Sequence, residues 1–203
     1  MEVEGRMKIL VINGSNLNLL GVREPALYGN RTYADLVRFI EASARDAGVE
    51  VEVFQSNHEG ALVDRIQAAR GVFDALVVNA AAYTHTSVAI LDALKAVGLP
   101  TVEVHLTNPA KRERFRHVSF VKPAALATFA GLGFGSYSRA IRYLAARAAN
   151  PKRKAQKPKL YTGNSKLETG DSNEPSSAFC DCQPGRHVYA HVYSERDFGL
   201  GGT

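Results

Sequence analysis

Two ionisable side chains, Glu103 and His105, stand one residue apart in the run TVEVHL. The run alternates in the way of a β-strand, and alternate side chains of a strand share a face. The carboxylate and the imidazole would therefore be neighbours at a strand end, and an imidazole beside a carboxylate suits proton transfer near neutral pH. A histidine there can also be purely structural, so the pair predicts a candidate site but no particular reaction.

A second histidine, His85, lies in the hydroxyl-rich stretch NAAAYTHTS at residues 79–87. Together with Ser87 and Asp92 it has the residue types of the catalytic triad of a serine hydrolase. The chain has no G-x-S-x-G elbow to present the serine, which disfavours that reaction. The plainer interpretation is that His85 caps the following helix together with Thr86 or Ser87.

The longest polar stretch, NGSNLNLLGVREPALYG at residues 13–29, contains Asn16, Arg23 and Tyr28. It is too long for a simple turn and could serve as a lid. Taken singly, each residue has an ordinary explanation: a turn for the asparagine, a solvated charge for the arginine and half-buried packing for the tyrosine. Whether these three residues belong to a functional site depends on which residues lie beside them in the fold.

Alternating strand and helix patterns must position these three stretches. Thr32 and Asp35 have the spacing of a capping box at the start of one helix, and Gly48 ends it. Strands are expected at residues 8–13, 49–55, 75–79 and 101–106 with a short fifth near 119–121, and the later helices carry Leu62, Ile66 and Ala69, run from Val88 to Gly98, and span 137–149. Five strands with interleaved helices predict an α/β fold of flavodoxin-like type, a parallel doubly wound sheet with helices on both faces.

The predicted fold indicates where a ligand would bind. In open α/β sheets, ligands lie outside the carboxyl ends of the strands. Those ends lead here into residues 13–28, 56–59, 79–87 and 105–116, which hold nearly all the unusual polar side chains. The sequence therefore predicts one site built from several loops.

The same stretches resemble the type II 3-dehydroquinate dehydratases, whose patterns are roughly NGPNLNLLGxREPxxYG, NPxAYTHTS and EVHLSNxxxRExFRxxS. The resemblance covers residues 7–148, and three long motifs in the right order make it specific. It implies a lyase without metal or cofactor that removes water from 3-dehydroquinate, through an enolate, to give 3-dehydroshikimate. Such a reaction serves the shikimate pathway, which leads to chorismate and the aromatic amino acids, or quinate breakdown.

Matching the motifs position by position implies a role for each residue. Tyr28 would be the base and Arg23 the cation that favours its phenolate. Asn16 would stabilise the enolate through a bound water, and His105 would be the general acid, oriented and charged by Glu103.

Further positions imply substrate contacts and assembly. The side chains of Asn79, His85 and Arg116 would hold substrate hydroxyls, and the backbone N–H groups of Leu106 and Thr107 would bind the carboxylate. Asp92 matches a position that reaches a neighbouring subunit's site, in a homododecamer built of trimers. Ser15 and Ala80 stand where proline is usual and Thr107 where serine is usual, but none of these departures removes a catalytic group.

The net charge of +5 comes from one short segment, since residues 150–160 carry five basic residues and no acidic one. The rest of the chain is neutral, so nucleic-acid binding is not expected. Composition also changes here, which predicts a catalytic domain at 1–149 and a disordered or loosely attached tail at 150–203.

Other classes of protein fit less well. The chain has no membrane-length apolar run, and its only cysteines, Cys180 and Cys182, give the main domain no disulfide, as suits the cytoplasm. A phospho-receiver needs acidic residues where Asn13 and Asn79 stand, and a flavodoxin needs a hydroxyl-rich loop after the first strand. An enzyme-derived binding protein stays open as an alternative if the tail blocks the cleft.

Overall fold

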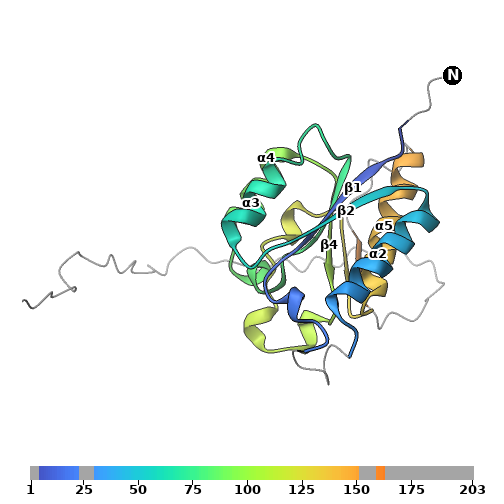
Figure 1. Ribbon diagram of the computed structural model, residues 1–203. Coiled ribbons are helices and arrows are strands. Elements are labelled where there is room, and N and C mark those ends of the chain that lie inside the picture. Colours follow the sequence, from blue (N-terminus) through green and yellow to red (C-terminus); the bar gives the residue numbers. More distant parts are fainter. Residues whose placement is uncertain (1–4, 23–29, 151–158, 163–203) are drawn as a thin grey trace, which may run out of the picture. The chain divides into compact units, whose positions relative to one another are not determined.

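Within the described residues, six parallel strands form one sheet. Helices cover both of its faces (Figure 1). The computed structural model describes residues 5–22 and 30–150, together with the backbone of residues 159–162. The strands are β1 (Lys8–Asn13), β2 (Glu50–Gln55), β3 (Ala75–Asn79), β4 (Thr101–His105), β5 (Ala127–Ala130) and β6 (Lys159–Thr162). Their order, β2-β1-β3-β4-β5-β6, places β2 at one edge. The predicted flavodoxin-like fold class is confirmed, with one strand more than expected.

Four α-helices of the described part of the chain make the two outer layers. They are α2 (Tyr33–Ala47), α3 (Glu59–Gln67), α4 (Val88–Val97) and α5 (Gly135–Ala149). Helices α2 and α5 pack on one face of the sheet, and α3 and α4 pack on the other (Figure 1). Short 3-10 helices lie at Leu17–Leu19, Ala81–His85, Pro109–Lys111, Arg114–Arg116 and Lys122–Ala124. The central strands are therefore covered on both sides, as their continuous apolar runs require.

The predicted capping box at the start of α2 is present. The backbone N–H of Asp35 donates to Thr32 Oγ1 at 3.2 Å, and the Thr32 N–H donates to Asp35 Oδ2 at 2.8 Å. The helix ends at Gly48, whose φ of 69° is the left-handed conformation favoured by glycine. Leu36 and Ile40 are fully buried, and each such side chain contributes about 1.5–3 kcal/mol to folding.

The prediction of a fifth strand near residues 119–121 is wrong. Strand β5 is Ala127–Ala130, and the earlier segment leads into a 3-10 helix that contains Pro123. Proline has no N–H to give to a strand ladder, and Val121 is instead fully buried against the core under α3 and α4. The last helix also begins at Gly135, two residues before the expected start at Tyr137.

Strand β6 was not predicted. Its four residues pair in parallel with β5 and lie beyond the expected domain boundary at residue 149. The boundary and the loose tail stay predictions, because most of residues 150–203, Cys180 and Cys182 included, lie outside the described part of the chain. Among the helices that are described, none has the length and apolar character needed to cross a membrane.

Candidate active site

A cleft of about 140 Å³ opens at the carboxyl ends of β1, β3 and β4. This is the side of the sheet on which the fold predicts a ligand. Its walls come from the loops that follow these three strands. Seven of the predicted site residues line it: Asn16, Asn79, His85, His105, Leu106, Thr107 and Arg116.

Gly14 lets the loops after β1 and β3 approach each other closely. Its N–H donates to the carbonyl oxygen of Asn79 at 2.7 Å. A Cβ atom at residue 14 would lie 2.2 Å from the carbonyl oxygen of Ala80, so any side chain would force the backbones apart. The next loop residue but one, Asn16, has a left-handed φ of 65° and donates its N–H to Asn57 Oδ1 at 2.8 Å.

Glu103 and His105 are paired as their strand spacing predicts. His105 Nε2 lies 2.9 Å from Glu103 Oε1, and the two residues are 8% and 1% exposed. Nε2 is used in this contact, so Nδ1 is the ring nitrogen that remains for a ligand. His105 itself lines the cleft. The carboxylate thus fixes the ring, and the ring can transfer a proton to or from a bound molecule.

Two hydroxyl groups hold Glu103 from behind. Ser119 Oγ donates to Oε1 at 2.7 Å, and Thr128 Oγ1 donates to Oε2 at 3.0 Å. Burial by itself would raise the pKa of Glu103, but the hydrogen bond and charge of His105 and these two hydroxyls outweigh it, so the pKa lies below its usual value. Glu103 is therefore a buried carboxylate.

This lowered pKa has a consequence for acid stability. A group whose folded pKa is depressed contributes stability that is complete above its unfolded pKa, which is near 4.5, and is lost as pH falls. We expect Glu103→Gln to lower the free energy of unfolding by about 1–3 kcal/mol at pH 6–7. The deficit relative to the wild type should shrink as pH falls from 5 to 3.

Urea denaturation at several pH values measures this difference. Glu41→Gln, which removes an exposed carboxylate from α2, is the control. A deficit for Glu103→Gln that stays constant down to pH 3 would contradict the ionised state of Glu103.

His85 is oriented by the loop before the fifth strand. Its Nδ1 lies 2.7 Å from the carbonyl oxygen of Val118, which can only accept, so Nδ1 carries the proton and Nε2 keeps a lone pair. Burial is the main cause that lowers the His85 pKa, and the charges of His105 and Arg116 lower it further. A neutral His85 therefore offers an acceptor. The helix-capping interpretation holds for Ser87, whose Oγ caps α4 by accepting from Ile90 N at 2.9 Å, and is wrong for His85, which bonds to Val118 instead.

The backbone carbonyl groups at the end of β4 are hydrogen-bonded to the segment around the start of α5. The carbonyl of His105 accepts from Ser136 Oγ at 2.8 Å, and that of Leu106 accepts from Gly133 N at 3.0 Å. Since no peptide bond among the described residues is cis, the N–H groups of Leu106 and Thr107 point away from those partners. Both residues line the cleft, where such N–H groups can bind a carboxylate.

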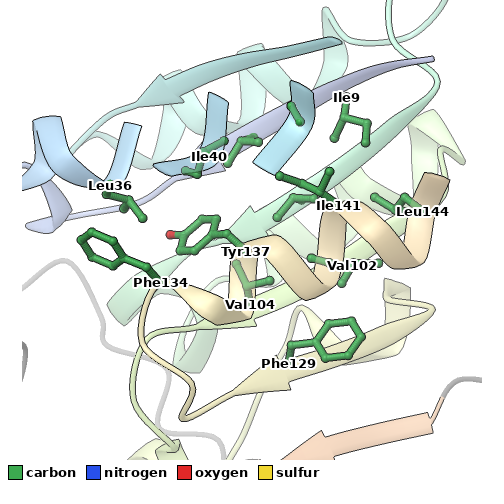
Figure 2. Close-up of a cluster of buried hydrophobic side chains, with 14 of the residues drawn as sticks. Ile9, Leu36, Ile40, Val102, Val104, Phe129, Phe134, Tyr137, Ile141 and Leu144 are labelled. Atoms are coloured by element: carbon green, nitrogen blue, oxygen red, sulfur yellow. The ribbon is translucent and has the colours of Figure 1, made fainter. Parts of the chain in front are cut away.

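A buried hydrogen-bond chain joins the ends of β1 and β3. Tyr137, at the start of α5, donates to Asn13 Oδ1 at 2.6 Å and accepts from Asn79 Nδ2 at 2.7 Å. Asn13 Nδ2 in turn donates to Tyr33 Oη at 3.3 Å. Figure 2 shows the Tyr137 ring among the apolar side chains beneath α2 and α5. Burial raises the pKa of Tyr137 far above its usual range, so the hydroxyl stays protonated.

Of the predicted residues that the structure describes, Glu103 and Asp92 do not line the cleft, and Glu103 contacts it only through His105. Asp92 is exposed on α4. Arg23 and Tyr28 lie outside the described residues.

Sequence reasoning missed two residues, Arg112 and Tyr137. Arg112 lines the cleft and stands in the same motif as Arg116, so the motif itself could have singled it out. For Tyr137, only its place in a helix pattern was visible in the sequence. Within the described residues, no group of three histidine, cysteine or acidic side chains could hold a metal ion.

Comparison with known proteins gives a consistent result. The family model described as "Dehydroquinase class II" matches residues 7–145. The 3-dehydroquinate dehydratase of Geotalea daltonii is 52% identical over 136 residues, which are 67% of this chain and 94% of that protein. A catabolic 3-dehydroquinase of Verticillium alfalfae is 53% identical over 138 residues, 68% of this chain and 92% of its own. The crystal structure of a type II dehydroquinase from Butyrivibrio crossotus matches with a TM-score of 0.67 and 48% identity, covering 68% of this chain and 97% of that one.

Proposed function

The chain belongs to the class II dehydroquinase family, and we propose that the cleft at the ends of β1, β3 and β4 is where it acts. It is a hydro-lyase that removes water from 3-dehydroquinate to give 3-dehydroshikimate. The observation that carries the assignment of the cleft is the buried pair of Glu103 and His105, 2.9 Å apart. This pair provides a positioned proton donor on a ligand-facing wall.

The first step is removal of a proton from the carbon next to the ketone. We assign the base to Tyr28, with Arg23 stabilising its phenolate, on the match of this loop to the family motif. A free tyrosine titrates near 10, so a base that works at pH 7 needs a neighbouring positive charge. The enolate oxygen that results is stabilised by the Asn16 amide through a bound water.

The second step is loss of the hydroxyl group as water. His105 donates the proton that the leaving oxygen needs, and the enolate electrons form the new carbon–carbon double bond as the C–O bond breaks. Glu103 compensates the positive charge of the imidazolium ring before this transfer. The proton taken by Tyr28 must return to His105 through solvent to close the cycle.

The remaining groups hold the substrate. The unprotonated nitrogen of His85 accepts from one hydroxyl, and Asn79 and Arg116 bind others. The N–H groups of Leu106 and Thr107 hold the carboxylate. Arg116 is itself held by Glu113, whose Oε2 accepts from Arg116 Nε at 2.9 Å. These contacts place the substrate between the base and the acid.

We further propose that the chain assembles as a homododecamer of trimers, in which Asp92 completes a neighbour's site. Three large apolar residues near the cleft support an interface: Val88, Phe115 and Val118 are 50%, 67% and 55% exposed. Val88 lies one helical turn before Asp92 on α4, and the Val118 carbonyl contacts His85. Exposed apolar residues gathered around a site are typical of subunit contacts.

The reaction serves either the shikimate pathway or quinate breakdown. A relative named as a catabolic 3-dehydroquinase and one named only as a 3-dehydroquinate dehydratase are about equally similar to this chain. We place the enzyme in the cytoplasm, because the cysteine content suits a reducing compartment.

Activity and assembly can be tested on one sample. Size-exclusion chromatography with light scattering should give a peak with the mass of twelve chains, and that peak should convert 3-dehydroquinate. The measurement is the ultraviolet absorbance of the conjugated enone product. Activity in a monomer peak would exclude the assembly and the role of Asp92, and no activity in any peak would exclude the reaction.

Treatment of the same sample with borohydride or a chelator distinguishes this mechanism from one that uses an imine and from one that uses a metal ion. The type I dehydratases form a Schiff base on a lysine, whereas Lys8, Lys95, Lys111 and Lys122 of the main domain do not line the cleft. We expect full activity after treatment with substrate and borohydride, and after EDTA. Inactivation by borohydride would indicate a covalent imine and overturn the mechanism.

A further inference from the structure

Resting on the proposed function, we propose that Tyr137 is a positioning residue that makes Asn79 present its N–H group to the substrate. Tyr137 has no part in either of the two proposed steps of the reaction. Tyr137 is fully buried on the face of the sheet under α2 and α5, while the cleft lies past the strand ends. Its hydroxyl nevertheless contacts a residue that lines the cleft.

The donor and acceptor in each hydrogen bond around Tyr137 follow from counting protons. A tyrosine hydroxyl has one proton to donate, so at most one of the two amides that meet Tyr137 Oη can offer it an oxygen. The N–H of Ala81 lies 3.3 Å from Asn79 Oδ1 and requires an acceptor there. Asn79 therefore turns its oxygen to Ala81 and its nitrogen to Tyr137, and Asn13 receives the hydroxyl proton.

Two features lock this arrangement. The backbone of Ala80, with φ −69° and ψ −5°, sets the peptide plane that directs the Ala81 N–H at Asn79 Oδ1. Asn79 and Asn13 are 3% and 0% exposed, so bulk water cannot replace the tyrosine as a partner.

One hydrogen of Asn79 is left for the ligand. The amide nitrogen has two hydrogens, and Tyr137 accepts only one of them. Since Asn79 lines the cleft, the second can be donated to a substrate oxygen. His85 also lines the cleft, and its unprotonated Nε2 is a hydrogen-bond acceptor. The site thus offers a donor and an acceptor of fixed polarity, which suits hydroxyl groups on a ring.

A double-mutant cycle tests the role of Tyr137. Tyr137→Phe keeps the ring in the core and should raise KM for 3-dehydroquinate by about 3- to 10-fold, with the shape of the pH–rate profile unchanged. In an Asn79→Ala background, the same change should have less than about a twofold effect, because no amide is left to orient. Tyr143→Phe, on the same helix and packed on Phe129, is the matched control and should leave KM unchanged.

Equal effects of Tyr137→Phe on KM in both backgrounds, or no effect in the wild-type background, would overturn the proposal. A purely structural loss would lower the melting temperature in both backgrounds and leave the two KM effects equal. Crystal structures of the wild type and Tyr137→Phe give a test that needs no turnover. The variant should lose the contact between Asn79 Oδ1 and Ala81 N, and an unchanged Asn79 amide would exclude the positioning role even if 3-dehydroquinate proved not to be the substrate.

Discussion

Replacing His105 by alanine is expected to lower kcat for 3-dehydroquinate by about two to four orders of magnitude. The elimination requires a proton on the leaving oxygen, and we propose as its donor His105, which the buried carboxylate of Glu103 holds. KM should change much less, because the binding groups on the other walls of the cleft remain. Steady-state kinetics at neutral pH separates the two constants.

His58→Ala is the matched control for this variant. His58 is exposed at the start of α3 and does not line the cleft. We expect its kcat to equal that of the wild type. If His105→Ala lost less than about tenfold in kcat, a different group would have to protonate the leaving hydroxyl.

Replacing Tyr28 by phenylalanine is expected to abolish measurable turnover at every pH while substrate binding persists. Phenylalanine keeps the ring but has no oxygen that can take the proton, and loss of an essential base costs at least about two to four orders of magnitude. Equilibrium binding by calorimetry, beside the kinetic assay, shows whether the inactive variant still holds 3-dehydroquinate. Near-normal turnover would end the assignment of Tyr28 as the base.

Arg23→Ala tests how the base is ionised. If the guanidinium lowers the Tyr28 pKa, its removal should cut turnover strongly at pH 7, and part of the loss should recover as pH rises. Each unit of pKa change corresponds to about 1.4 kcal/mol, so a shift of the pH–rate profile toward base is measurable. Arg23 could instead act only by holding the loop closed. In that case the ratio of variant to wild-type rates would be flat from pH 6 to 10.

The sequence was most informative where one local pattern decides the structure. The continuous apolar runs at residues 8–13 and 75–79 are the central strands β1 and β3, and Gly48 and Gly98 end their helices as expected. The alternating run before His105 correctly placed its carboxylate partner. These features depend on periods of two or 3.6 residues, which can be read directly along a chain.

What the sequence could not give depends on contacts between distant segments. The ring of His85 is fixed by Val118, 33 residues further on, and Tyr137 meets Asn13 across 124 residues. The ionised state of Glu103 needs hydroxyls from Ser119 and Thr128, on two different segments. Strands β5 and β6 have only four residues each, too few for a period to be recognised.

The place of β2 at the edge of the sheet bears on how the chain avoids aggregation. An edge strand presents unpaired backbone groups to which a strand of another molecule could add, the usual route to uncontrolled self-association. In β2, Glu50 and Glu52 are exposed at alternate positions, and Glu52 pairs with Arg65 of α3. Two carboxylates on this short edge would meet the same two on an approaching copy, and like charges would repel. The edge therefore disfavours growth of the sheet from one molecule to the next. Association between molecules then depends on other surfaces, where contacts between side chains rather than backbone groups decide which partner binds.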